Sequence, residues 1–384
     1  MNIDTINEFV FSKHNIVPGT QLNSIEDVAR NHLGLHAARI GSPYTTLCSR
    51  LLQYETKMLT NKLYEEKTLI KLRCMRTTLH IAPYDIAPIL FNATKDVRLS
   101  ECLTFFKRNN ISLNRVDELE SEIISIITEK GLHAKAIEEW IIAKTEKIIE
   151  PEIKKIFAKK VLKYYWEKGV LSYFNAASNW EKEDRKYVIT KSFYPNLNLD
   201  IYQVEDAKEL LIIENIKKFG PVTLKDISWW SGLGLNIIKS TIEKNSTKIC
   251  KFKVNGFEND FYISNEDFHE LKNYNVKDIE WISFLAFEDP SLKGYHDSRL
   301  RYVDEMNLKH LLNQIGEVQA SVIHNGKVIG TWIWDKKKKK MEINYFIHQD
   351  TSLIKKINQE KEKYEQILYS TTQNTLFSES EFLL

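Results

Sequence analysis

The spacing of hydrophobic residues along the chain predicts short amphipathic helices, each group followed by a pair of strands. Near the start, Ile6, Phe9 and Val10 recur at the spacing of one helix face, so a helix is expected over residues 3–13. Further helices with one apolar side are expected over 24–32, 43–51, 60–67, 114–130, 137–141, 151–168, 207–219, 224–230 and 235–244. Stretches rich in strand-forming residues lie at 69–82, 170–174, 186–190, 248–254 and 261–263.

Three helices followed by two strands is the element order of a winged helix-turn-helix unit. The order occurs three times, so we expect an α+β fold, mainly α, with three tandem winged units and a small C-terminal antiparallel β-barrel. The expected segments are winged unit one with the His36 loop, winged units two and three, the barrel-like segment, and a helical or frayed tail. Their boundaries are 1–112, 113–200, 201–275, 276–350 and 351–384.

The second and third units read as copies of one another. Residues 131–140 and 220–229 carry Gly, Ile and Trp at matching positions, and the same elements surround both stretches. We therefore expect Trp140 and Trp229 to be core residues, with base stacking as the less favoured alternative.

The C-terminal part changes from helical to strand-like. Apolar stretches at 279–287, 318–323, 327–334 and 341–347 predict a small antiparallel sheet or barrel. Asn325-Gly326 is a strong signal for a two-residue hairpin turn. The lysine run 336–340 reads as a solvated hairpin tip, with a grip on phosphates as the alternative.

Composition narrows the class of protein. The 384 residues are 43% hydrophobic with a net charge of +2, which supports folded cores and neither requires nor excludes nucleic acid. Four scattered cysteines without a CxxC pair argue against a zinc ribbon or a disulfide scaffold. No signal-peptide pattern or membrane-length apolar run occurs, so a cytoplasmic protein is expected.

One loop carries candidate chemistry. Between the predicted second and third helices stand His36 and Arg39, just before Ser42-Pro43, which reads as an N-cap and a first helical position. A helix N-terminus is electropositive and has free N–H groups, so it suits a phosphate. A hydrogen-bonded structural role for His36 is the alternative.

Common catalytic motifs are absent from the sequence. It contains no GxxxxGK[ST] loop, no GxGxxG after a strand and no GxSxG elbow. The histidines are dispersed and no HExxH occurs, so we expect no metal site.

Several stretches together resemble the AlkZ-like family of winged-helix crosslink-repair DNA glycosylases. The loop Gly34-Leu-His-Ala-Ala-Arg39 is similar to the family's catalytic loop, and Met75-Arg-Thr-Thr-Leu-His80 to its Met-Arg-Gly-Thr-Leu-His strand. Similar landmarks follow in the family's order at Gly220–Thr223, Trp229–Leu233, Phe284–Arg301 and Gly326–Trp332. The resemblance covers about residues 5 to 350 and implies duplex DNA as the partner, with no membrane and a monomeric protein.

The resemblance implies hydrolysis of the N-glycosidic bond to a bulky alkylated or crosslinked purine by a monofunctional glycosylase. The family's signature has two polar residues separated by one residue, which hold a water and stabilise the cation at the sugar. The resemblance also implies no metal and no organic cofactor. Here the first position is His36 and the second is Ala38. His36 is therefore the expected catalytic residue. The expected DNA-binding residues are Arg39, Ser42, Tyr44, Arg76, His80, Arg299 and Arg301.

Ala38 keeps two other functions open. One is a damage-recognition or regulatory protein with weak or no catalysis, which would bind duplex DNA in a salt-sensitive way without forming abasic sites. The other, more distant, is a sequence-specific transcription factor. His80 also has a structural alternative, as a hydrogen-bonded strand residue.

Overall fold

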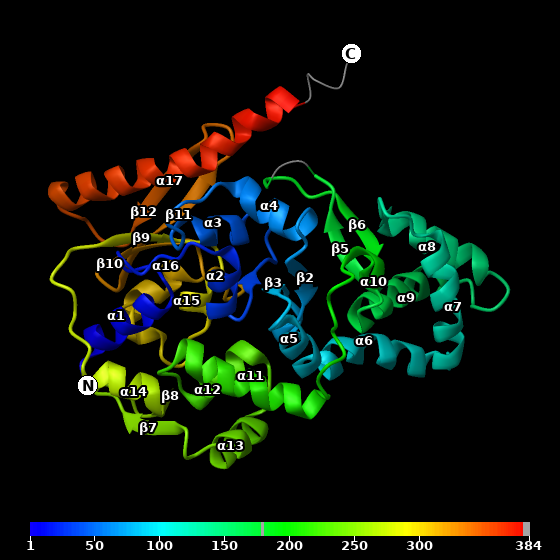
Figure 1. The fold of residues 1–384 in the computed structure, drawn as a ribbon, viewed down its shortest axis with the longest axis horizontal. Coiled ribbons are helices and arrows are strands. Elements are labelled where there is room, and N and C mark those ends of the chain that lie inside the picture. Colours follow the sequence, from blue (N-terminus) through cyan, green and yellow to red (C-terminus); the bar gives the residue numbers. More distant parts are fainter. Residues whose placement is uncertain (178–179, 379–384) are drawn as a thin grey trace.

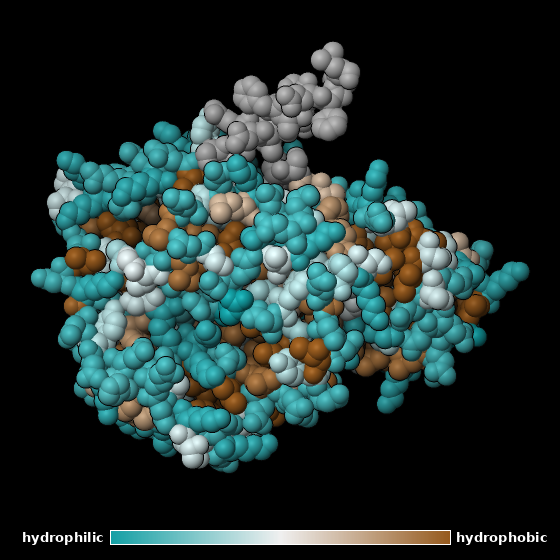
Figure 2. Space-filling model, in the orientation of Figure 1, coloured by the Kyte–Doolittle hydropathy of each residue, from teal (hydrophilic) through white to brown (hydrophobic). Residues whose placement is uncertain are grey.

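The computed structural model describes residues 1–177 and 180–378. In this part of the chain, helices surround small antiparallel sheets (Figure 1), which confirms an α+β fold dominated by helices. Figure 2 shows a largely hydrophilic face with separate hydrophobic patches, as is normal for a folded protein. Among the described helices, none combines the length and apolarity that a membrane crossing requires.

The first segment builds helices around a three-stranded sheet of order β1-β3-β2. All its predicted helices and strands are present, and α5 and α6 are additional helices that the pattern did not predict. The elements are α1 (Ile3–Lys13), α2 (Ile25–Asn31), β1 (Leu35–His36), α3 (Ser42–Cys48), α4 (Thr56–Tyr64), β2 (Leu69–Arg73), β3 (Leu79–Pro83), α5 (Ala87–Ala93) and α6 (Lys95–Arg108).

Two helix starts test the predicted capping. Ser24 caps α2 as predicted, because its side chain accepts a hydrogen bond from the Asp27 N–H at 3.2 Å. Helix α3 starts one residue earlier than predicted, at Ser42, with Gly41 as its N-cap. Pro43 lies in the first turn, where its missing N–H leaves no helical bond unmade.

The second and third segments repeat the expected order of helices and strands. The second has the sheet order β4-β6-β5, and the third has the pair β7-β8. The elements of the second are α7 (Leu113–Ile126), β4 (Leu132–His133), α8 (Ala134–Lys144), α9 (Lys154–Lys168), β5 (Leu171–Asn175), β6 (Arg185–Ile189) and α10 (Thr190–Phe193). Those of the third are α11 (Val204–Phe219), α12 (Leu224–Ser231), α13 (Leu235–Lys244), β7 (Ile249–Lys253), β8 (Asp260–Ser264) and α14 (Asn265–Lys272).

The two tryptophans matched by the repeat do not both lie in a core. Trp140 is half-buried against the core of the second segment, but Trp229 is half-buried beside Arg76. Its neighbour Trp230 is the buried one. Successive residues on a helix point about 100° apart, so only one of two adjacent tryptophans faces the core. The prediction that Trp229 is a core residue is therefore wrong.

The C-terminal sheet is open, so the predicted β-barrel is wrong. Its four strands have the order β12-β11-β10-β9, and a sheet of this size has too few strands to close on itself. Helix α17 covers it instead (Figure 1), with Leu353, Ile357 and Tyr364 in one core with Phe284 and Trp332. The elements are β9 (Ile282–Leu285), α15 (Pro290–Lys293), α16 (Leu308–Leu311), β10 (Ser321–His324), β11 (Lys327–Asp335), β12 (Lys340–Tyr345) and α17 (Thr351–Ser378). Residues 379–384 of the predicted tail lie outside the described part.

Both predicted turns of this sheet are present. Asn325 and Gly326 join β10 to β11 with φ of +44° and +81°, the left-handed conformation of a type I′ turn. The lysine run forms the turn between β11 and β12, where Lys338 pairs with Glu342 at 2.6 Å and Lys339 with Glu181 at 2.7 Å. These carboxylates offset part of the positive charge of the tip.

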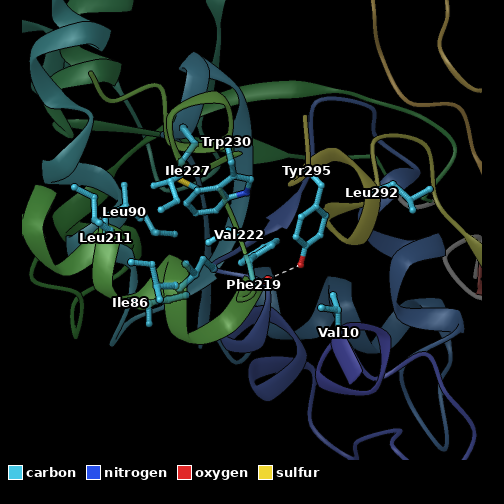
Figure 3. Close-up of a cluster of buried hydrophobic side chains, with 14 of the residues drawn as sticks. Val10, Ile86, Leu90, Leu211, Phe219, Val222, Ile227, Trp230, Leu292 and Tyr295 are labelled. Carbon is cyan, nitrogen blue, oxygen red and sulfur yellow. Dashed lines mark hydrogen bonds between the residues drawn. The ribbon is translucent and has the colours of Figure 1, made fainter. Parts of the chain in front are cut away.

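One core runs through segments that are far apart in the sequence. Figure 3 shows Val10 of α1, Leu90 of α5, Trp230 of α12 and Leu292 of α15 in the same cluster, which also holds Tyr295. The Tyr295 hydroxyl donates to the backbone carbonyl of Phe219 at 2.7 Å. The 290–295 stretch is thereby fixed against the first and third segments.

Candidate functional site

The antiparallel pairing of β1 with β3 places two histidines side by side. His36 lies directly opposite His80, and their ring centroids are 5.3 Å apart in an edge-to-face arrangement. Gly34 precedes β1 with φ of +94°, and a Cβ there would come within 3.2 Å of the His80 Cβ. Glycine is thus required for the turn that aligns the pair.

A carboxylate from a distant part of the chain faces the same place. Glu288 follows β9 and has φ of +57°, a strained conformation for a residue with a side chain. Its Oε1 accepts the backbone N–H of Val318 at 2.7 Å, and its Oε2 forms an ion pair with Lys293 of α15. The Lys293 ammonium also lies 3.2 Å from His36 Nε2. His36, Lys293 and Glu288 therefore form one connected group.

These side chains line a small cavity. The volume open to a water-sized sphere is about 10 Å³, close to what one water molecule needs. The lining residues are Gly34, His36, Met75, Arg76, Thr78, His80, Trp230, Glu288, Pro290 and Lys293.

Burial fixes the charge of the two histidines. It lowers the pKa of His36 well below its usual 6.5, with the Lys293 ammonium and His80 adding to the effect. Burial likewise lowers the pKa of His80 to about 3. Both rings are thus neutral at physiological pH. The Lys293 ammonium donates to His36 Nε2, which places the proton of a neutral His36 on Nδ1. Nδ1 is buried and has no partner among the described residues.

A second, fully enclosed network holds the Glu288 segment in place. Asp289 pairs with Arg50 at 2.7 Å, and both side chains are 0% exposed. Arg50 also donates to the Ser291 hydroxyl at 2.9 Å and to His32 Nε2 at 3.1 Å. The ion pair ties the first segment to the residues on both sides of Pro290, next to the cavity.

Four of the residues predicted to contact DNA are buried: Ser42, Tyr44, His80 and Arg301. The Tyr44 hydroxyl is 3.1 Å from Thr60 Oγ1, and Arg301 donates to Asn7 Oδ1 at 2.7 Å. These contacts stabilise the fold.

The other predicted arginines lie at or near the surface. Arg39 is exposed, 3.4 Å from the Glu317 carboxylate, with its guanidinium 5.0 Å from the centre of the Phe287 ring. Arg299 is half-buried. Arg76 reaches the cavity from the turn between β2 and β3, where its own φ is +51°.

Arg76 is held by an aromatic partner. Its guanidinium lies 3.6 Å from the centre of the Trp229 ring, and the His296 ring is 4.4 Å from the same indole. Such stacking positions the cation beside the cavity.

Sequence reasoning identified His36 and His80 but missed Glu288 and Lys293. The two histidines share a local strand pairing, whereas Glu288 and Lys293 arrive through tertiary packing. The available signal was a carboxylate pair, Glu288-Asp289, directly after the apolar run 282–287. Within the described ranges, no group of three or more His, Cys, Asp or Glu side chains is placed to hold a metal ion.

Comparison with known families defines the class of protein. The family described as DNA glycosylase AlkZ-like matches residues 29–363, most of the chain. The chain therefore belongs to the AlkZ-like DNA glycosylase family. The fold agrees with a solved structure, that of the Streptomyces sahachiroi DNA glycosylase AlkZ, with a TM-score of 0.77 over 96% of both chains at 16% identity. A comparison with curated proteins gave no match.

Proposed function

We propose that this protein is a DNA glycosylase that removes a bulky N-alkylated or crosslinked purine from duplex DNA by hydrolysing the N-glycosidic bond. Family membership supports DNA as the substrate. The three helix-and-strand segments act in this proposal as winged helix units that grip the duplex, and the protein works as a cytoplasmic monomer without a cofactor.

The observation that carries the proposal is that Glu288 and His36 line the same cavity, of about one-water size, and that both contact Lys293. In the family's signature two polar side chains near the loop serve this purpose, and the second position here is Ala38, which is exposed and has no polar group. Glu288 supplies the second polar group from another part of the chain.

In the proposed hydrolysis, each of these side chains has a separate role. His36 Nδ1–H donates to the water oxygen and holds it, while the Glu288 carboxylate accepts a proton from the same water. The C1′–N bond breaks, its electron pair leaves with the purine, and the water oxygen bonds to C1′. The Glu288 charge also stabilises the positive charge that develops on the sugar.

Lys293 keeps this arrangement in the correct protonation state. Its ammonium pairs with Glu288 and donates to His36 Nε2, so the proton of the neutral His36 lies on Nδ1. The Glu288–Lys293 pair is neutral overall, so it does not oppose the cation at C1′.

Incubation with duplex DNA that carries a bulky N7-alkylguanine tests the proposal. The wild-type protein should produce abasic sites that alkali converts to strand breaks, and His36→Ala should slow their formation about 100-fold. His348→Ala, at an exposed histidine outside the cavity, is the matched control and should keep the wild-type rate.

The same assay separates the catalytic function from the binding alternative. Salt-sensitive binding to damaged duplex without abasic product would contradict the proposal and favour a non-catalytic damage-recognition protein. An unchanged rate in His36→Ala would show that His36 does not hold the water.

A further inference from the structure

We infer that Lys293 gives this site a second activity, in which its amine condenses with the abasic sugar and cleaves the DNA strand at that position. The inference rests on the proposed function, because base removal would produce an abasic sugar beside the cavity that Lys293 lines. It adds a lyase step to the monofunctional activity that the family resemblance implies.

The position of the amine carries the inference. Lys293 Nζ forms an ion pair with Glu288 Oε2 and lies 3.2 Å from His36 Nε2, and its side chain is 16% exposed. A lysine must lose its proton before it can attack a carbonyl carbon, and the Glu288 carboxylate is in contact to accept it. The proton that must leave therefore has an acceptor already in contact.

The chemistry needs no further reactant. Glu288 takes a proton from Lys293, and the neutral amine adds to C1′ of the open-chain aldehyde form of the abasic sugar. Glu288 returns that proton to the C1′ hydroxyl, which leaves as water, so that a protonated imine and an ionised Glu288 remain. Glu288 removes a proton from C2′, the C–H electron pair forms a C2′–C3′ double bond, and the C3′–O bond breaks with release of the phosphate. Water then hydrolyses the imine and returns the free amine.

Burial of a lysine by itself does not give this arrangement. Lys71 of β2 is more buried, and burial lowers its pKa to about 8, yet it is not among the residues that line the cavity. Its ammonium lies 4.5 Å from the centre of the Tyr173 ring. Lys293 combines an amine, a proton acceptor and a position at the cavity beside which base removal would produce the abasic sugar.

Reductive trapping tests the inference. The full chain is mixed with a duplex that already contains an abasic site, in the presence of sodium borohydride, which reduces any imine to a stable amine. A covalent protein–DNA adduct should form, and mass spectrometry of its peptides should place the link on Lys293. Lys293→Arg, which keeps the charge but forms no such imine, should lower adduct formation at least tenfold.

Lys208→Arg is the matched control, because Lys208 is a similarly covered lysine with two carboxylate partners, Asp96 and Glu205. Lys208→Arg should form as much covalent adduct as the wild-type protein. Absence of an adduct, a link on another amine such as the N-terminus, or equal trapping by Lys293→Arg would each overturn the inference. Peptide mapping on the wild-type protein keeps the test valid even if the variant folds poorly.

The preformed abasic site makes this test independent of base removal. Excision of an alkylated purine without trapping would overturn the lyase inference and leave the glycosylase proposal intact. Trapping on Lys293 without any excision would support the inference and contradict the proposed function.

Discussion

Glu288 and Asp289 are adjacent in the sequence, yet their surroundings differ completely. Glu288 lines a cavity with His36 and Lys293, whereas Asp289 is sealed in the interior against Arg50. Glu288 also has a strained backbone conformation, with φ of +57°. The comparison separates a carboxylate that is placed to meet a reactant from one that is placed to hold the fold.

The two ion pairs differ in whether a cavity lies beside them. Asp289 and Arg50 are enclosed on all sides, and Arg50 makes further hydrogen bonds to Ser291 and His32. Among the described residues, Asp289 Oδ2 and His36 Nδ1 both lack a hydrogen-bond partner, but only His36 and Glu288 line the cavity. An unpaired donor beside a carboxylate and a cavity is expected at a site that awaits a water or a substrate.

The largest effect on stability should come from breaking the enclosed pair. Asp289→Ala leaves the Arg50 charge buried and unpaired, which should lower the free energy of unfolding by about 3–5 kcal/mol. Urea unfolding followed by circular dichroism measures the change. Glu280→Ala removes an exposed carboxylate that pairs with Lys356 and His324, and should cost about 1 kcal/mol or less. Equal losses in the two variants would contradict the distinction.

Acid should lower the stability of the fold because each of the two places holds a buried histidine. His80 lines the cavity, and His32 contacts Arg50. Burial lowers the pKa values of His80 and His32 to about 3. Between about pH 6.5 and 3 the unfolded chain binds protons at these histidines while the folded chain does not, so stability falls as pH falls. Each contributes about 1.4 kcal/mol per pH unit.

Urea unfolding at pH 7, 6 and 5 measures this slope. His80→Asn should flatten it by about 1 kcal/mol per unit on average over this range, and the exposed His348→Asn is the control. A wild-type slope in His80→Asn would show that His80 is protonated in the folded protein.

The smallest effect on stability is expected at the surface. Arg39→Ala removes an exposed ion pair with Glu317 and should change the free energy of unfolding by less than about 1 kcal/mol. If Arg39 contacts a phosphate, the same variant should reduce the slope of log affinity against log salt by about 1 for duplex DNA. Fluorescence anisotropy over a salt series measures this slope, and an unchanged slope would remove Arg39 from the DNA interface.

Local sequence signals predicted the parts of the fold that depend on neighbouring residues. Asn325-Gly326 requires a left-handed backbone at both positions and forms the expected hairpin turn, and Ser24 caps α2 as expected. Helix α5 was missed although Pro88 lies in its first turn, a position where proline is tolerated. The barrel was wrong because closure depends on how many strands pair, which the pattern of single strands does not give.

The residues of the candidate site also fall into two groups, those that were predicted from the sequence and those that were missed. His36 and His80 were predicted because the loop and the strand that carry them resemble the family's motifs, and the antiparallel register brings them together. Glu288 and Lys293 were missed because their approach depends on the packing of Leu292 and Tyr295 into the shared core (Figure 3) and on the Arg50–Asp289 pair. These contacts join segments that lie hundreds of residues apart, and a single sequence carries no direct record of them.

The most direct test of the central claim is the single-turnover rate of base excision by Glu288→Gln on duplex DNA with a bulky N7-alkylguanine. The glutamine carbonyl keeps a hydrogen bond from the Val318 N–H but cannot accept the proton of the water. We expect the rate measured on the folded variant to fall about 100- to 1,000-fold, with Glu280→Gln at the wild-type rate. Excision by Glu288→Gln at the wild-type rate would contradict the account.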